Sequence, residues 1–217
     1  MKTADVIIVG SGAAGLFNAL FLPQDYKVIV ITKKTVEESD SFLAQGGISA
    51  LKNPEDYDSY FEDTMKAGHY ENDKGAVEKM IKESPQIIQD LKDFGVRFDL
   101  KDGEIEFTRE GGHSTFRILH HEDLTGKEIT SHLYEEAKKR DNITIMENCM
   151  MIDIIEKDGE CKGIVYKDQD GNFDTIEAPD TVLATGGLGG LFKHSTNFRH
   201  LTADSLAICL RHNVTLE

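Results

Sequence analysis

An α/β fold with a parallel sheet at its centre is predicted by three features of the sequence. A β-branched run at residues 5–9 is typical of a buried strand, and it leads through a glycine-rich turn into an alanine-rich helix that begins at Ala13. A second buried strand is expected at residues 27–32, at the distance found in βαβ units. A further run, at residues 181–187, is predicted to return as a buried strand that ends in small residues.

The turn after the first strand has the pattern G-x-G-x-x-G. Gly10 permits the tight turn, Gly12 leaves room for a pyrophosphate near the backbone, and Gly15 allows the helix to pack closely on the strand. The free N–H groups and the positive end of the helix dipole would face the phosphates. A strand, turn and helix without a ligand is the alternative. The second strand in the expected place favours a Rossmann-like nucleotide-binding unit.

Composition limits the classes of protein that need consideration. The chain has 217 residues, enough for one sizeable α/β domain, and it is 39% hydrophobic with no apolar run as long as a transmembrane helix. A formal net charge of −15 argues against nucleic acid as a partner. The first residues enter a strand directly, which leaves no room for a signal peptide. Cys149, Cys161 and Cys209 have no metal-ligand spacing and form no even-numbered framework, so we expect reduced thiols, no metal site and a cytoplasmic location.

Three helices are predicted in the middle of the chain. The first two cover residues 56–68 and 74–95, where apolar residues recur near helical spacing in the second. Pro85 lies inside the second helix and predicts a kink or two abutting helices. A third helix is expected from Thr125, a plausible N-cap, to about Arg140.

Two glycine-containing segments with polar side chains are expected to be functional loops. Residues 41–50 contain Gly46–Gly47, which would let backbone N–H groups approach another molecule, although an ordinary turn is the alternative. Residues 108–114 are dense in functional groups and glycine. They follow two predicted strands, at residues 96–100 and 104–107, that alternate around a tight turn.

The last third of the chain is predicted to be rich in strands. A strand at residues 143–146 opens this section, and an antiparallel meander of strands at 150–157, 161–167 and 172–178 follows. A final helix is expected at residues 203–212. We therefore divide the chain into a βαβ nucleotide unit at residues 1–50, a helical and loop insertion at 51–141, and the β-meander with the return strand at 142–217.

The interrupted sheet favours FAD over NAD as the dinucleotide. In a standard NAD domain strands and helices alternate steadily, whereas an insertion and a meander separate this βαβ unit from its return strand. The second strand also ends in Thr32 and Lys33, where the simple fingerprint has an Asp or Glu for the ribose. A threonine hydroxyl can still bond a ribose, and a lysine can meet a phosphate.

Four motifs, in this order, make the resemblance to a known family specific. They are Gly10-Ser11-Gly12-Ala13-Ala14-Gly15, Ala44-Gln45-Gly46-Gly47-Ile48, Thr108-Arg109-Glu110-Gly111-Gly112-His113-Ser114 and Ala184-Thr185-Gly186-Gly187. Together they resemble the flavoprotein family of succinate dehydrogenase and fumarate reductase, and within it the amino-terminal part of the L-aspartate oxidases. The resemblance covers nearly the whole chain. It implies a Rossmann-like FAD-binding domain with a helical insertion and an antiparallel meander, in which the family's capping domain is absent.

The resemblance also implies which residues contact the cofactor. The glycine turn would hold the FAD pyrophosphate, and Lys33 would lie near the adenosine end. Asp204 matches an acidic residue of the family, although two positions around it depart from the family's pattern. The full set of implied cofactor contacts is Gly10, Ser11, Gly12, Ala13, Ala14, Gly15, Thr32, Lys33, Asp40, Ser41, Phe42, Leu43, Ala44, Gln45, Gly46, Gly47, Met151, Ile152, Ala184, Thr185, Gly186 and Asp204.

Three further residues bear on the chemistry that the resemblance implies. Succinate dehydrogenases attach FAD covalently through a histidine where this chain has Asp40, and a carboxylate cannot form that link, so FAD is expected to be non-covalent. Glu110 replaces a bulky apolar residue of those relatives. Beside the flavin its carboxylate could pair with the α-ammonium of aspartate, while a structural carboxylate is the alternative. His113 is the second candidate for contact with substrate or flavin, weighed against an ordinary polar loop residue.

The implied reaction is the oxidation of L-aspartate to iminoaspartate, with oxygen or fumarate as acceptor, in NAD biosynthesis through quinolinate. Quinolinate synthase is then an expected partner. In the family, the substrate arginines, the principal proton-transfer residue and the cap lie beyond the position of Glu217. We therefore expect this polypeptide to bind FAD with little or no turnover, and to self-associate through surface that those parts cover. The alternatives are a soluble fumarate reductase or succinate dehydrogenase-like flavoprotein, and a non-catalytic FAD-binding module.

Overall fold

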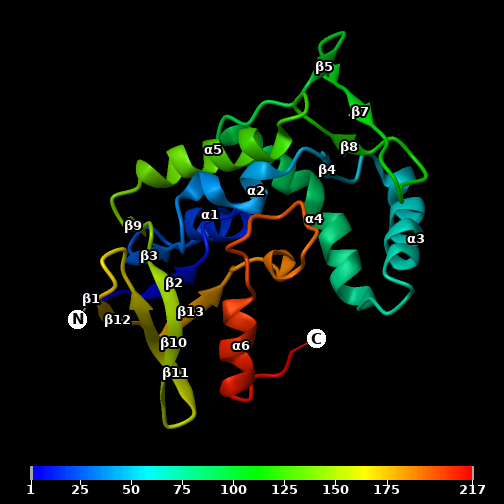
Figure 1. Ribbon diagram of the computed structural model, residues 1–217. Coiled ribbons are helices and arrows are strands. Elements are labelled where there is room, and N and C mark those ends of the chain that lie inside the picture. The colour runs from blue at the N-terminus through cyan, green and yellow to red at the C-terminus, as the bar shows by residue number, and fades with distance from the viewer. Residues whose placement is uncertain (1, 217) are drawn as a thin grey trace. The chain divides into compact units, whose positions relative to one another are not determined.

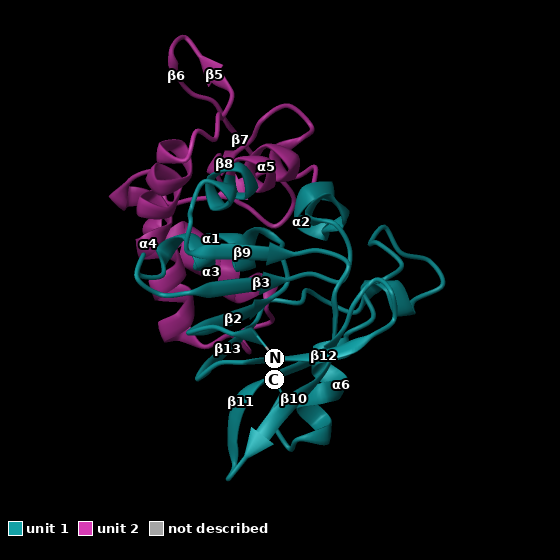
Figure 2. Cartoon of the chain, turned by 90° about the vertical axis from the view of Figure 1, so that its left-hand side faces the viewer, with its two compact units in different colours: residues 1–43, 133–217 teal, residues 44–132 magenta. Residues whose placement is uncertain are grey.

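The structure, a computed structural model, describes residues 2–216, and the elements of that range are drawn in Figure 1. The chain divides into two compact units, coloured separately in Figure 2. Unit 1 comprises Met1–Leu43 and Leu133–Glu217, and unit 2 comprises Ala44–His132. The predicted FAD-binding part extends to Glu217, and that residue lies outside the described range. Within that range, every helix is too short or too polar to cross a membrane.

Unit 1 is built on a parallel four-stranded sheet with the strand order β13-β2-β3-β9. The helix α1, Ala13–Phe21, connects the first two strands of the chain's βαβ unit, as the sequence predicts. The four strands are β2 (Val6–Val9), β3 (Val28–Ile31), β9 (Ile143–Met146) and β13 (Asp180–Leu183). The strand predicted at residues 143–146 forms as β9, which pairs with β3 and places Ile143 and Ile145 against the core of the parallel sheet.

A second four-stranded sheet in unit 1 has the order β1-β12-β11-β10. Its strands are β1 (Lys2–Thr3), β10 (Met150–Lys157), β11 (Glu160–Lys167) and β12 (Phe173–Glu177). The last three pair antiparallel and confirm the predicted meander. The strand β1 pairs parallel with β12, so the start of the chain joins the sheet of the meander. This pairing was not predicted from the sequence.

The core of unit 1 follows from the alternation of side chains along the central strands. Ile7 and Val9 of β2 pack with residues of the meander and with Ile208 of α6, Asp204–Arg211. Val6 and Ile8 point to the opposite face and pack with Ala19 of α1. Because both faces are covered, all four residues are buried, as expected for a strand in a parallel sheet.

Short helical elements complete unit 1. The helix α6 confirms the helix predicted near residues 203–212. The others are η1 (Val36–Glu38), α2 (Asp40–Leu43) and η3 (Gly189–Leu191).

Unit 2 combines helices with two small sheets. Its three-stranded sheet has the order β4-β8-β7, and β5 and β6 form a separate hairpin. The strands are β4 (Ile48–Ser49), β5 (Leu100–Lys101), β6 (Glu104–Ile105), β7 (Phe107–Thr108) and β8 (Ile118–Leu119). The helices are η2 (Pro54–Asp56), α3 (Tyr57–Ala67), α4 (Lys74–Asp93) and α5 (Thr125–Lys138), and the boundary with unit 1 falls within the last of them.

The helix α4 continues through Pro85 without dividing into two helices. Proline has no N–H, so the carbonyl of Ile81, four residues earlier, lacks its usual donor. The hydroxyl of Ser84 donates to that carbonyl at 2.7 Å and replaces the missing bond. The same hydroxyl oxygen accepts from the amide of Leu51 at 2.8 Å. Of the two outcomes expected at Pro85, a kink or two abutting helices, the second is wrong, because one helix spans Lys74–Asp93.

The strand predicted at residues 96–100 is also wrong, except for Leu100 in β5. Val96 and Phe98 are buried, as the alternation of the sequence predicts. The backbone, however, forms single bonds rather than a ladder, with the amide of Asp99 bonded to the carbonyl of His120. Alternating burial therefore arose here without a paired strand.

Candidate functional site: a cofactor cavity and a glycine loop

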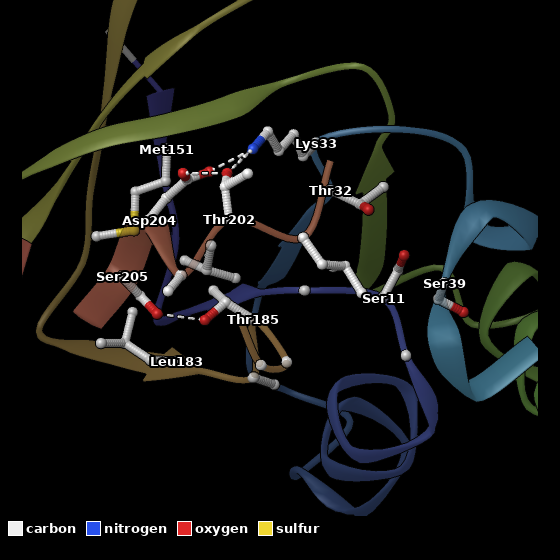
Figure 3. A pocket seen from close by; sticks show the side chains of 18 of the residues that line it. Ser11, Thr32, Lys33, Ser39, Met151, Leu183, Thr185, Thr202, Asp204 and Ser205 are labelled. Carbon is white, nitrogen blue, oxygen red and sulfur yellow. Dashed lines mark hydrogen bonds and ion pairs between the residues drawn. The ribbon is translucent and has the colours of Figure 1, made fainter. Parts of the chain in front are cut away.

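Unit 1 contains a cavity of about 530 Å³ at the carboxyl ends of β2, β3 and β13, seen from close by in Figure 3. The start of β10 contributes Met151 to its wall, and α6 contributes Ser205. The carboxyl ends of parallel strands are where doubly wound sheets bind their ligands. The volume lies in the range of sites for small molecules and cofactors.

The glycine turn is packed so tightly that side chains cannot enter it. At Gly10 the backbone has φ +114°, and a Cβ would lie 2.1 Å from the carbonyl oxygen of Ala184. At Gly15 a Cβ would lie 2.0 Å from the carbonyl oxygen of Gly10. The close packing of helix and strand at Gly15 is thus confirmed. At Gly10 the missing side chain allows both the tight turn and the close contact with Ala184 at the end of the return strand.

Two features of the turn fit a phosphate-bearing ligand. No side chain of residues 2–216 caps the N-terminus of α1, so its first N–H groups are left for another acceptor. The hydroxyl oxygen of Ser11 lines the cavity, is buried, and has no hydrogen-bond partner among the described residues. Buried polar atoms are rarely left without a partner. The residues present therefore fit a dinucleotide whose pyrophosphate lies at this helix end.

The ammonium group of Lys33 is bound by the chain itself. Its Nζ donates to the carbonyl of His200 at 2.7 Å, to the hydroxyl of Thr202 at 2.9 Å and to a carboxylate oxygen of Asp204 at 2.6 Å. Figure 3 shows the Lys33 side chain pointing toward Thr202 and Asp204, with dashed lines for these bonds. Three donors thus have three partners, and Lys33 holds the segment of residues 200–204 along the cavity wall.

Replacing Lys33 by methionine should weaken FAD binding about tenfold, because the 200–204 segment loses its anchor and Asp204 keeps only the hydroxyl of Thr202. Titration of the apoprotein with FAD, followed by the quenching of flavin fluorescence, measures the change. Lys34→Met, at the exposed neighbouring position, is the matched control and should leave the affinity unchanged. Equal affinity in the two variants would contradict the anchor.

Asp40 is likewise engaged by the chain. One of its carboxylate oxygens accepts from the amide of Phe198 at 3.1 Å, and the other accepts from the side-chain amide of Asn197. The side chain also lines the cavity. Asp40 therefore connects the start of α2 to the chain just before the segment that Lys33 holds.

Most of the cofactor contacts expected in unit 1 come together at this one cavity. Those that line it are Gly10, Ser11, Gly12, Ala14, Thr32, Lys33, Asp40, Ser41, Met151, Ala184, Thr185, Gly186 and Asp204. Those that do not are Ala13, Gly15, Phe42, Leu43 and Ile152. On β10 the cavity is lined by the first two residues, Met150 and Met151, and Ile152 lies beyond it along the strand.

Sequence reasoning missed several residues of the wall. His200, Leu201 and Ser205 surround Asp204 in the chain, and the hydroxyl of Ser205 contacts that of Thr185. The available signal was that His200 and Leu201 come just before the predicted helix, while Ser205 lies in its first turn next to the expected contact Asp204. Cys149 and Cys209 also line the cavity, and burial raises the pKa of the Cys149 thiol. Nothing in their spacing indicated that position.

Unit 2 brings the other two glycine motifs together. The amide of Gly47 donates to a carboxylate oxygen of Glu110 at 2.8 Å. A Cβ at Gly46 would lie 3.2 Å from the other oxygen of the same carboxylate. Glu110 is exposed, so its carboxylate is fixed at one oxygen and open to solvent. The residues Ala44 and Gln45 precede this contact on the same loop and are exposed.

His113, three residues further on, faces a buried ion cluster instead. Its Nδ1 lies 3.1 Å from a terminal nitrogen of Arg117, whose side chain is fully buried. Arg117 binds both carboxylate oxygens of Asp56, at 2.8 and 2.9 Å. Burial alone would raise the pKa of Asp56, but hydrogen bonds from Arg117, Ser59 and Thr115 outweigh it and lower that pKa to about 2.

The parallel sheet, the glycine turn and the cavity at the strand ends define a dinucleotide-binding domain of the Rossmann-like class. The family described as FAD binding domain matches residues 5–217. The chain belongs to this family, and its cofactor is FAD.

Several similar proteins are L-aspartate oxidases. An L-aspartate oxidase of Clostridium perfringens is 44% identical over 216 residues, which are 100% of this chain and 49% of the relative. An L-aspartate oxidase of Clostridium acetobutylicum is 46% identical over 211 residues, 97% of this chain and 48% of the relative. The chain thus spans about half the length of these relatives.

Solved structures share the fold over nearly the whole chain. An E. coli quinol fumarate reductase superposes with a TM-score of 0.93 at 28% identity and covers 98% of this chain and 38% of its own. The Mycobacterium smegmatis Sdh1 complex superposes with a TM-score of 0.88 at 32% identity and covers 97% and 39%. The predicted fold class, an α/β FAD-binding domain with an insertion and a meander, is confirmed.

Proposed function

We propose that this chain is the FAD-binding part of an L-aspartate oxidase, which oxidises L-aspartate to iminoaspartate. The observation that carries the proposal is the 44% identity to an L-aspartate oxidase over 100% of the chain. The position of Glu110 supports it further, since an open carboxylate at Gly47 suits a substrate that carries an ammonium group. Succinate and fumarate have no such group, so the same carboxylate would repel them.

FAD, when bound, supplies the two-electron chemistry of such a reaction. The chain's own residues would bind and orient the reactants. Ser11 and the N-terminus of α1 would receive the pyrophosphate, and the segment held by Lys33 would enclose the cofactor. Glu110 would pair with the α-ammonium of L-aspartate, with His113 beside it on the same loop. FAD would stay non-covalent, because Asp40 offers a carboxylate that is already bonded to Asn197 and Phe198.

The reaction also suggests partners and a compartment. L-aspartate would be the electron donor and oxygen or fumarate the acceptor, and quinolinate synthase would consume the imino product. The thiols of all three cysteines are free, which agrees with the cytoplasm as the compartment.

The cofactor part of the proposal is tested by the visible spectrum of the FAD-loaded protein before and after acid precipitation. The flavin colour should pass into the supernatant, because nothing links it covalently. Colour retained in the pellet would contradict the argument from Asp40. A protein that takes up no FAD would contradict the assignment of the cavity.

The substrate part is tested by a chimera in which this chain replaces the matching part of the Clostridium perfringens enzyme. The FAD-loaded chimera should produce peroxide with L-aspartate and not with succinate. Glu110→Gln in the same chimera should raise the KM for L-aspartate about tenfold or more, since the charge that pairs with the ammonium is lost. Oxidation of succinate alone would favour the succinate dehydrogenase-like alternative. A chimera that binds FAD and oxidises neither would favour a non-catalytic module.

A further inference from the structure

The loop that carries Glu110 has little packing of its own. It joins β7 to β8, and a Cβ at Gly111 or Gly112 would meet no atom of the described chain within 4 Å. Its far end is bound tightly instead. The amide and hydroxyl of Ser114 both donate to Asp63, at 2.7 and 2.8 Å, and the hydroxyl of Thr115 donates to Asp56 at 2.8 Å. The position of the loop therefore depends on two carboxylates of the helical segment before it.

Arg117 holds those two carboxylates in place. Its guanidinium binds Asp56 through two nitrogens and Asp63 at 2.6 Å, and it lies 4.8 Å from the centre of the Tyr60 ring. The side chain is 0% exposed, and each of its three nitrogens has a protein partner. A guanidinium offers five donors in a planar fork, so it fixes the directions of its partners as well as their distances.

A chain of contacts also leads from Arg117 through the strand β4 to Glu110. The ring of Tyr60 packs on Arg117, and its hydroxyl donates to Ser49 at 2.6 Å. Ser49 belongs to β4, which directly follows Gly47, and the amide of Gly47 binds Glu110. Both sides of the contact between Gly47 and Glu110 are thus anchored at one buried residue.

Arg117 also determines which nitrogen of His113 carries the proton. The guanidinium can only donate, so the Nδ1 of His113 at 3.1 Å must accept. The ring proton then resides on Nε2, which makes the other side of the ring a donor.

We propose that Arg117 is the positioning residue of the loop between β7 and β8, residues 109–117: it holds the Glu110 carboxylate at the amide of Gly47 and sets His113 as an Nε2–H donor. The proposal rests on the proposed function for its meaning, because the ligand of Glu110 is there an α-ammonium group. The contacts that Arg117 is proposed to hold are present in the protein without substrate, so they can be tested without it. Arg117 touches neither substrate nor cofactor in this scheme and acts through the residues that it holds.

Amide hydrogen exchange at Gly47, measured by NMR in the 217-residue protein, tests the positioning without any substrate. Glu110→Ala gives the reference value, which is the exchange rate of the Gly47 amide when its contact with residue 110 is absent. Arg117→Lys keeps the charge but not the planar fork, and it should accelerate the exchange of Gly47 about tenfold although Glu110 is unchanged. Long-range ¹H–¹⁵N spectra of His113 should show the Nε2–H form in the wild type and a mixture of both forms in the variant.

Two controls separate positioning from general stability. Arg109→Lys alters an exposed arginine of the same loop and should change the exchange of Gly47 less than about twofold. The amide of Ile88, inside α4, should change less than about threefold in Arg117→Lys. Uniform acceleration across unit 2 would overturn the proposal, since Arg117 would then be a stabilising residue only.

Thr115→Val covers the case in which Arg117→Lys does not fold. It removes the hydroxyl bond to Asp56 while Arg117 keeps its ion pairs, and it should accelerate Gly47 exchange by about threefold. Unchanged exchange at Gly47 in every folded variant of Arg117 and Thr115 would overturn the proposal. A chimera that fails to oxidise L-aspartate would overturn the proposed function instead, and leave the exchange data in place.

Discussion

Gly10→Ala should abolish FAD binding and destabilise unit 1 by about 3 kcal/mol or more. Two costs combine at this position. The backbone has φ +114°, which L side chains rarely adopt, and the new methyl carbon would lie 2.1 Å from the carbonyl oxygen of Ala184. Relief would require β13 to move away from β2, and both strands end at the cavity. Urea unfolding followed by circular dichroism, together with FAD titration, measures both effects.

Gly111→Ala is the matched control for this substitution. A Cβ there would meet nothing within 4 Å, and no positive φ is required. Its free energy of unfolding should stay within about 0.5 kcal/mol of the wild type. A Gly10→Ala protein that is equally stable and binds FAD normally would show that the turn can relax, contrary to the packing described above.

Asp56→Ala should cost about 3–5 kcal/mol of unfolding free energy, the range for breaking one side of a buried ion pair. The substitution removes two bonds to the fully buried Arg117 and one each to Ser59 and Thr115. The guanidinium would keep Asp63 and the hydroxyl of Ser59 as partners and would stay buried. Asp58→Ala removes an exposed carboxylate in the first turn of α3, the helix that follows Asp56; it is the control and should cost less than about 1 kcal/mol.

The pH dependence of stability provides an independent check on Asp56. Its pKa is lowered from 3.8 to about 2 in the folded protein, so the folded state favours the charged form. The stabilisation is therefore complete above pH 3.8 and is lost as the pH falls from there toward 2. Stability of the wild type should decline over this window, and Asp56→Ala should flatten that part of the curve. An identical decline in both proteins would mean that other carboxylates dominate.

Local patterns were sufficient to predict most of unit 1. The runs of β2 and β3 are buried on both faces, and a continuous apolar strand next to a glycine turn has few other places to go. The pairing of β1 with β12 was not predictable in this way, because two residues carry no periodicity and their partners lie about 170 positions away. The same limit applies to β9, whose four residues fit either sheet until its neighbour is known.

Unit 2 was harder to predict, for reasons that concern single side chains. The continuity of α4 depends on the hydroxyl of Ser84, which no propensity scale registers. At the candidate site the motifs indicated Glu110 and Gly47 correctly as loop residues, but not that they touch. Arg117 had no signal at all, since a lone arginine in an apolar stretch is ordinary in sequence and exceptional only once it is found fully buried.

The discontinuity of unit 1 has a consequence for the order in which the protein is made. The strand β2 is complete at residue 9, but its partner β13 ends only at residue 183. At ordinary rates of synthesis a ribosome needs roughly 10 to 35 seconds to cover that interval. Until then one edge of an entirely apolar strand has no neighbour, although β3 can pair with the other edge early. During synthesis the parallel sheet and its cofactor cavity therefore stay incomplete until after all of unit 2 has been made.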